Sequence, residues 1–182
     1  MELFEAIRGR RAVRDFSPED VDATTIMTLI DAAIQAPSAI DQQPWHFAVV
    51  KEQSLLGRIS AAAKMHRLRS ESVVELRQSL EDPAFHIFYH APALIVISAK
   101  RQTPWVVEDC ALAAENLMLA AHGIGLGSCW IGFAQDYLNT AEGRDMLKLP
   151  GDAIAVAPII VGYPRSVPPP HTRHAPQVRW VS

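Results

Sequence analysis

The sequence predicts a single globular domain, residues 1–182, in which helices and strands alternate along the chain. Of its 182 residues, 49% are hydrophobic and 20% are charged, and the formal net charge is -3. This length suits one domain, and the high apolar content with low net charge excludes disorder. The longest apolar stretches, residues 91–99 and 153–162, are shorter than the ~20 residues that span a bilayer. We therefore expect no membrane contact and, with no apolar signal segment after Met1, a cytoplasmic protein.

The N-terminal quarter predicts two helices followed by a strand. Residues 3–14 suit a short first helix with an apolar face at its start. Asp22 can cap a second helix, whose apolar positions between 26 and 34 follow the spacing of a buried face. Prolines enclose a loop, residues 37–44, that ends this helix and leads into a strand at residues 45–50.

The rest of the chain predicts a helical region, a buried strand, a central helix and two more strands. Residues 54–80 are polar and helix-favouring, whereas residues 93–98 are too uniformly apolar for a sheet face in water. Residues 108–122 are apolar nearly all round, so we expect a central helix buried on several sides. Residues 129–131 and 154–161 predict further strands.

The tail, from about residue 163 to residue 182, is rich in proline. Five prolines lie between Pro164 and Pro176, and such a segment cannot form a compact element. We expect it to lie extended along another surface.

Four arginines between Arg8 and Arg14 stand out in a chain that is mildly acidic overall. Their planar guanidinium groups suit a phosphate, and on a helix Arg10 and Arg14 would project from the same side. A solvated basic face is the alternative. A nucleic-acid partner is not expected, because the pI is 6.1 and no aromatic residues interleave with the arginines.

Other features are weaker when taken singly. The loop of residues 37–44 could bind a small ligand through its backbone and hydroxyl groups, or it could be a connecting loop without a ligand. The glycines from 123 to 132 lack the GxGxxG spacing of a dinucleotide loop, although small residues there would let the backbone approach a flat group. No metal cluster or convincing acid–base pair is visible, and Cys129 has no cationic sequence neighbour that would activate its thiol.

Together, six segments are similar, in order, to the FMN-dependent nitroreductase family. They are residues 10–16 (RRAVRDF), 36–47 (APS…QPWHF), 82–92 (DP…FYHAP), 109–121 (D…NLMLAA), 125–130 (GLGSCW) and 162–173 (GYP…R). The resemblance implies an α+β sandwich with a central, mainly antiparallel sheet flanked by helices. It also implies an interlocked homodimer with FMN at the subunit interface and the tail packed on the partner subunit.

The resemblance also implies roles for individual residues. Arg10 and Arg173 match phosphate-binding arginines, and Arg14 matches a basic residue near the flavin pyrimidine edge. Arg11 and Ala12 belong to the same cofactor-binding motif. The cofactor-binding loop from the second subunit comprises Pro37, Ser38, Ala39, Asp41 and Gln43, of which the first three cover the flavin ring. Trp130, Ile131 and Gly132 match a segment whose backbone approaches the other side of the ring.

Three departures from the family pattern matter. Ala12 stands where the family usually has serine, so only its backbone N–H remains to meet the cofactor. Asp41 replaces an asparagine, and its carboxylate would oppose a negatively charged flavin. Residues 54–80 are all that remains of a longer helical segment that often shapes the substrate channel.

The implied function is an enzyme of the NAD(P)H-dependent flavin oxidoreductase class. In a ping-pong cycle, NADH or NADPH reduces FMN, and a small-molecule acceptor (a nitroaromatic, a quinone or an activated alkene) then takes the electrons. No side chain acts as a catalytic group, because the cofactor carries the chemistry and Arg14 tunes it. Two alternatives remain: a non-catalytic module that binds FMN or senses nucleotides, and other flavin chemistry such as dehalogenation, flavin cleavage or double-bond reduction.

Overall fold

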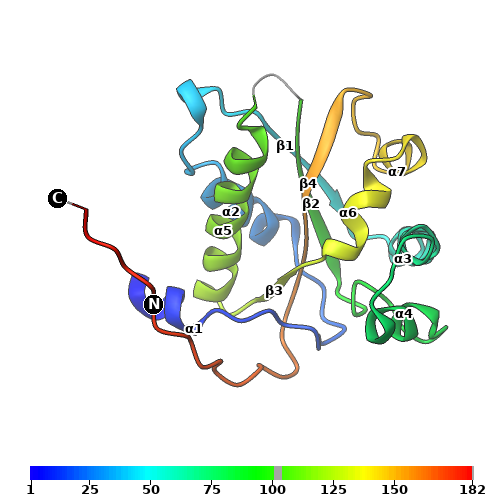
Figure 1. Ribbon diagram of the computed structural model, residues 1–182, viewed down its shortest axis with the longest axis horizontal. Helices are drawn as coiled ribbons and strands as arrows, with labels where there is room; N and C mark the ends of the chain where they lie inside the picture. The colour runs from blue at the N-terminus through cyan, green and yellow to red at the C-terminus, as the bar shows by residue number, and fades with distance from the viewer. Residues whose placement is uncertain (101–103, 182) are drawn as a thin grey trace.

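The computed structural model describes residues 1–100 and 104–181, and this part of the chain forms one four-stranded sheet between helices (Figure 1). The strands are β1 (Trp45–Val50), β2 (Ala93–Lys100), β3 (Gly127–Trp130) and β4 (Ala153–Gly162). Their order is β1-β2-β4-β3, and each neighbouring pair is antiparallel. The α+β class and the antiparallel sheet expected from the sequence are therefore confirmed.

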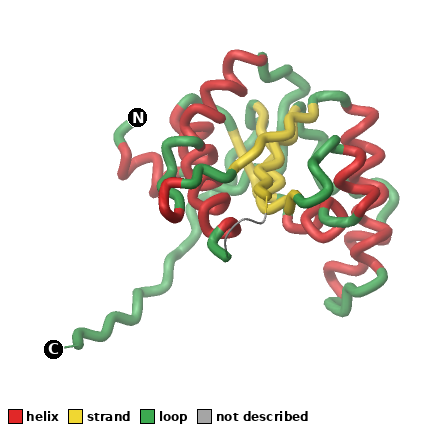
Figure 2. The backbone as a smooth tube through the Cα atoms, turned by 90° about the horizontal axis from the view of Figure 1, so that it is seen from above, coloured by secondary structure: helices red, strands yellow, loops and turns green. Residues whose placement is uncertain are grey.

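Helices cover both faces of this sheet (Figures 1 and 2). On one face lie α2 (Ala23–Ala33) and α5 (Val106–Gly123), with α1 (Leu3–Gly9) beside α5. On the other lie α3 (Gln53–Leu68), α4 (Val74–Glu81), α6 (Gly132–Leu138) and α7 (Ala141–Met146). A single 3-10 turn, η1 (Ala39–Asp41), lies in the loop between α2 and β1.

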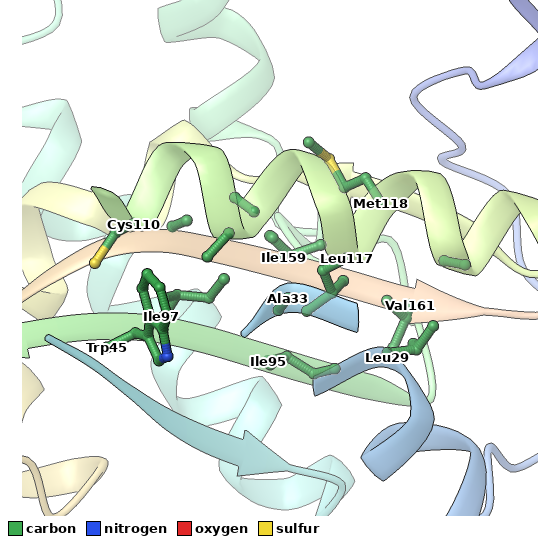
Figure 3. Packing of buried hydrophobic residues seen from close by; sticks show 14 of the residues in the cluster. Leu29, Ala33, Trp45, Ile95, Ile97, Cys110, Leu117, Met118, Ile159 and Val161 are labelled. Atoms are coloured by element: carbon green, nitrogen blue, oxygen red, sulfur yellow. The ribbon is translucent and has the colours of Figure 1, made fainter. Parts of the chain in front are cut away.

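Each face of β2 packs into its own hydrophobic cluster. Ile95 and Ile97 lie in the cluster with Leu117 of α5 (Figure 3), whereas Leu94 and Val96 lie in the cluster on the α3 side. Successive side chains of a strand point to opposite faces. This double burial explains the uniformly apolar sequence of the strand and confirms the prediction that it is buried.

The first helix is shorter than the sequence predicted. It ends at Gly9 rather than residue 14, and Arg10 is already extended, with ψ 135°. Backbone pairing explains the difference, because Ala12 forms a parallel bridge with Ser128 of β3. The prediction that Arg10 and Arg14 share a helix face is therefore wrong.

Other elements agree with the predictions or refine them. Asp22 caps α2 by accepting a hydrogen bond from the backbone N–H of Thr25 at 2.9 Å. Residues 54–80 fall into two helices, α3 and α4, and the chain also forms α6 and α7, which the sequence did not predict. Helix α5 is buried along one side, but Val107 and Leu112 are exposed on the other.

The tail runs away from the body of the molecule (Figures 1 and 2). Residues 167–181 form neither helix nor strand, and Trp180 is 92% exposed. Its extended form was expected, while its packing on a partner subunit stays a prediction. In the described parts of the chain, every helix is too short or too polar to span a membrane.

Candidate functional site

The arginine motif lies as an extended segment along the edge strand β3. The backbone N–H of Val13 donates to the carbonyl of Ser128 at 3.0 Å. Gly127 allows this close approach, because a Cβ there would lie 2.8 Å from the Val13 side chain. Further along, Phe16 forms a bridge with Pro164, and the N–H of Ser17 donates to Tyr163. The motif is thus fixed between β3 and the chain that leaves β4.

A small cationic cavity opens beside this segment. It has a volume of about 200 Å³, and its lining includes Arg10, Arg11, His122 and Ser128. Three buried polar atoms in this lining have no hydrogen-bond partner among the described residues: Arg10 Nε, Arg11 Nε and Ser128 Oγ. Arg10 Nε lies 3.5 Å from Glu115 Oε1, an ion pair without hydrogen-bond geometry. Because unpartnered buried polar groups are costly, the cavity suits a ligand rich in acceptor oxygens.

His122 forms part of the wall of this cavity. Its imidazole packs against Gly9, where a Cβ would lie 2.6 Å from Nε2. Burial lowers the pKa of His122, and the positive charges of Arg10 and Arg11 lower it further. His122 therefore adds a neutral group to the cavity near pH 7, and the two arginines carry its charge.

A second cavity lies at the other end of β3. It has a volume of about 360 Å³ and is lined by Arg14, Arg67, Tyr89 and the segment 129–133. The Arg14 guanidinium carbon lies 5.9 Å from the centre of the Tyr89 ring. Arg67 pairs with Glu71 at 3.0 Å and with Asp136 at 3.1 Å, so it ties α3 to α6 at this wall. The cavity offers the Arg14 cation, the already paired Arg67, the end of β3 and aromatic side chains.

The thiol in this cavity is not an activated nucleophile. Burial raises the pKa of Cys129, although Arg14 and Arg10 oppose the shift. Because the thiolate is the nucleophilic form, the group stays protonated near neutral pH. The structure therefore agrees with the sequence-based interpretation of Cys129 as a buried strand thiol.

The loop of residues 37–44 is held in an unusual backbone conformation. Ile40, Asp41 and Gln43 all have positive φ, at 47°, 55° and 48°, a region that bulky residues rarely adopt. Internal hydrogen bonds support this shape, since Ser38 Oγ accepts from the Gln43 N–H and Gln43 Nε2 donates to Asp41 Oδ1, each at 2.9 Å. Aspartate, like asparagine, tolerates positive φ, so the departure at position 41 keeps the backbone of the loop.

Asp109 anchors this loop to the first turn of α5. Its Oδ1 accepts a hydrogen bond from the Ala39 N–H at 2.9 Å, and the residue is only 3% exposed. At about 1.5 Å per residue, the anchor lies about 20 Å along the helix from His122. The loop and the cationic cavity are therefore at opposite ends of α5 within one chain.

The structure brings some of the sequence-predicted residues together and leaves others apart. Arg10, Arg11, Ala12 and Arg14 lie along β3, whose end continues through Trp130, Ile131 and Gly132. The loop residues Pro37, Ser38, Ala39, Asp41 and Gln43 lie at the far end of α5, and Arg173 is exposed in the tail. Sequence reasoning did not single out Ser128, His122 or Tyr89, although Ser128 and Tyr89 stand inside two of the motif segments.

Comparison with solved structures defines the class of protein. A nitroreductase with bound FMN from Bacteroides fragilis superposes with a TM-score of 0.88, at 27% identity and with all of both chains covered. The fold is thus that of the nitroreductase-type α+β oxidoreductases. The nitroreductase family model matches residues 7–163, and the chain belongs to this family.

Two relatives of this chain are named for different reactions. A Methanothermobacter thermautotrophicus protein named for NADH dehydrogenase and NAD(P)H nitroreductase activity is 31% identical over 173 residues, which cover 92% of this chain and 80% of the relative. An iodotyrosine deiodinase from Thermotoga neapolitana is 26% identical over 188 residues, covering 98% and 97% of the two chains.

The titration of His86, beside the second cavity, should make the stability of the fold depend on pH. Its Nδ1 accepts the N–H of Phe88 at 3.2 Å. Burial, then the His90 ring and the charge of Lys64, lower the pKa of His86 from 6.5 to about 4. The unfolded chain therefore binds this proton first, and stability falls as the pH drops from about 6.5 to about 4. Allowing for partial exposure, the loss attributable to His86 is about 2 kcal/mol.

His86→Asn keeps an acceptor for the Phe88 N–H but removes the titration. Urea unfolding at pH 7 and pH 4 should show a smaller acid-induced loss in this variant than in the wild type. His46→Asn, at an exposed position of β1, serves as the control. Equal acid sensitivity in His86→Asn and wild type would contradict this interpretation.

Proposed function

We propose that this chain is an FMN-dependent oxidoreductase that takes electrons from NADH or NADPH and passes them to a nitroaromatic, a quinone or an activated alkene. The observation that carries the proposal is the pair of cavities along β3. One holds unpartnered cationic N–H groups, and the other is a larger cavity with Arg14 at its wall. The FMN-bound relative from Bacteroides fragilis supports the same cofactor.

The residues present fit FMN in its two parts. Arginine side chains form charge-assisted hydrogen bonds to phosphate, and Arg10 and Arg11 have buried Nε atoms available for them. The cavity at Arg14 adjoins the end of β3 at Trp130, where the backbone can approach a flat ring system. FMN fits better than FAD, because the cavity beside Arg10 and Arg11, of about 200 Å³, suits one terminal phosphate.

The side chains of the protein would bind the cofactor and adjust its redox potential, and the cofactor would carry the redox chemistry. FMN, when bound, supplies hydride and electron transfer. Arg10 and Arg11 would hold its phosphate, and Arg14 would place a positive charge beside the ring. Because burial raises the pKa of the Cys129 thiol, this residue would not act as a nucleophile toward the substrate.

The separation of the loop from the cavities supports a site shared between two copies of the chain. No residue of the loop lines either cavity of its own chain, whereas a second copy of the chain could supply the loop. Exposed apolar side chains are available for such an interface on α1 (Leu3 and Phe4) and on α5 (Val107 and Leu112). We propose a homodimer, and sedimentation of the FMN-loaded protein as a 20 kDa species would contradict it.

The function is tested by the flavin itself. Purified protein should show the visible absorption of oxidised flavin, which NADH or NADPH should bleach without oxygen. Adding a nitroarene or a quinone should restore it. Bound flavin that neither nicotinamide bleaches would instead indicate a binding or sensing module.

Reductive dehalogenation is the second candidate, because a deiodinase relative matches nearly the whole chain. The same anaerobic assay separates the two. After chemical reduction of the flavin, 3-iodo-L-tyrosine and a nitroarene are offered separately. Faster reoxidation by the iodotyrosine, with release of iodide, would favour dehalogenation over nitro reduction.

Arg14 should set the redox potential of the bound flavin. Two acidic residues close to Arg14 in the sequence have other partners: Asp15 pairs with Arg165 at 3.4 Å, and Asp20 pairs with Lys51 at 2.8 Å. A positive charge beside the ring favours the reduced, more negative flavin, and only such a differential interaction shifts the equilibrium. Arg14→Gln should therefore lower the two-electron midpoint potential by about 30 mV for ~1.4 kcal/mol of lost coupling.

Spectroelectrochemistry at equal FMN occupancy measures this shift. Arg58→Gln, at an exposed position of α3, should leave the potential unchanged. Identical midpoints in Arg14→Gln and wild type would show that the charge lies elsewhere.

A further inference from the structure

Ala12 has no hydroxyl, but Ser128, its partner across the backbone bridge, has one. Ala12, where the resemblance to the nitroreductase family implies a serine, pairs with Ser128 in a parallel bridge. Residues paired side by side in this way send their side chains to the same face. Ser128 therefore presents its hydroxyl on the face toward which a serine at position 12 would point.

Ser128 is also an unusual buried serine. It is 2% exposed, and its Oγ has no hydrogen-bond partner among the described residues. Burying a hydroxyl without a partner is unfavourable, and most buried hydroxyls are paired. Ser98, a buried serine of β2, donates to the carbonyl of His46 at 3.3 Å. The contrast indicates that the partner of Ser128 is a group outside the described residues.

The surroundings of Ser128 identify the chemistry of that group. Ser128 lines the same cavity as Arg10 and Arg11, whose buried Nε atoms are also unpartnered. The three donors thus belong to residues that line one cavity, two on cationic side chains and one on a short neutral one. Such a set suits an oxyanion with several acceptor oxygens, which a phosphate provides.

We propose that Ser128 donates a hydrogen bond to the phosphate of bound FMN and thereby replaces the hydroxyl missing at Ala12. This inference rests on the proposed function, because it takes FMN as the ligand. It adds a specific binding residue in β3 to the arginine motif, and it explains how the chain accommodates alanine at position 12. Ser128 is a binding group and takes no part in the electron transfer.

The test compares FMN with riboflavin, which lacks the phosphate. Apoprotein prepared by dialysis is titrated with each flavin, and binding is followed by quenching of flavin fluorescence. Ser128→Ala should raise the Kd for FMN by about five- to thirtyfold and leave the Kd for riboflavin unchanged. Ser98→Ala should leave both unchanged, because that hydroxyl lies on β2 and has its own partner.

A double variant supplies the decisive result. Ala12→Ser in the Ser128→Ala background should restore FMN affinity to within about twofold of wild type, since the hydroxyl returns on the same face. Circular dichroism checks that each variant folds, and Ser128→Cys, of similar size, substitutes for Ser128→Ala if the alanine variant does not.

Each outcome separates this inference from the proposed function. Wild-type protein that binds FMN tightly, with a Ser128 variant that binds it equally well, would overturn the inference and leave the function standing. An equal loss for riboflavin and FMN would also overturn it, because the contact would then not be to phosphate. Wild-type protein with no affinity for either flavin would overturn the proposed function as well.

Discussion

Arg10→Ala should purify largely free of FMN. The guanidinium borders the cationic cavity, and its buried Nε has no hydrogen-bond partner among the described residues beyond the 3.5 Å ion pair with Glu115. Losing a charge-assisted contact to phosphate costs about 1.5–3 kcal/mol. This corresponds to a roughly ten- to hundredfold weaker affinity. Flavin absorbance relative to protein after dialysis, followed by titration of the apoprotein, measures the effect. Mass spectrometry of the released flavin should find FMN in the wild type.

Arg8→Ala is the matched control for Arg10→Ala. Arg8 lies in the last turn of α1, is exposed, and stacks at 6.0 Å on the Phe4 ring. Its removal deletes the same charge two residues away and should leave FMN occupancy unchanged. Full occupancy in Arg10→Ala after dialysis, or release of FAD from the wild type, would show that the phosphate is not held as proposed.

Asp109→Ala should destabilise the fold and loosen the loop that follows α2. The carboxylate is buried and accepts the Ala39 N–H, and a hydrogen bond to a charged group contributes about 1.5–3 kcal/mol. We expect the free energy of unfolding, measured with urea, to fall by about 2 kcal/mol. Hydrogen exchange should accelerate at Ala39 more than in β2.

Two variants isolate the role of the Asp109 carboxylate. Asp109→Asn keeps an oxygen that can accept the Ala39 N–H and should recover most of the lost stability. Glu108→Ala removes a neighbouring exposed acid of the same helix turn and should cost little. Unchanged exchange at Ala39 in Asp109→Ala would contradict the anchoring role.

The elements that the sequence predicted well are those whose pattern is local. The apolar run of β2 and the Asp22 cap before α2 each depend on a few adjacent residues, and both agree with the structure. The predicted end of the first helix was wrong for the opposite reason. Ala12, which the sequence placed in this helix, instead pairs with Ser128, more than a hundred positions away. Local helix propensity cannot predict such a long-range pairing. Helices α6 and α7 have only 7 and 6 residues, too few for a periodic signal.

The residues of the candidate site also differ in whether a local pattern or a long-range contact identifies them. The arginines at 10 and 14 and the segment at Trp130 could be found because they form recognisable motifs. The contact between Ala39 and Asp109 spans 70 positions, so the sequence alone gave the carboxylate no partner. Whether Arg173 reaches the phosphate stays a prediction, since the tail is exposed in the single chain.

The distance between the Asp109 anchor and the arginine cavity along α5 has a genetic consequence. If two copies share each site, a chain carrying Arg10→Ala and a chain carrying Asp109→Ala are defective in different halves. A mixed dimer then combines both defects in one site and leaves the other with an intact cavity and an intact loop. Random mixing of equal amounts puts about one site in four in the intact class. Two alleles that each impair the site when expressed alone would therefore partly complement one another when expressed together.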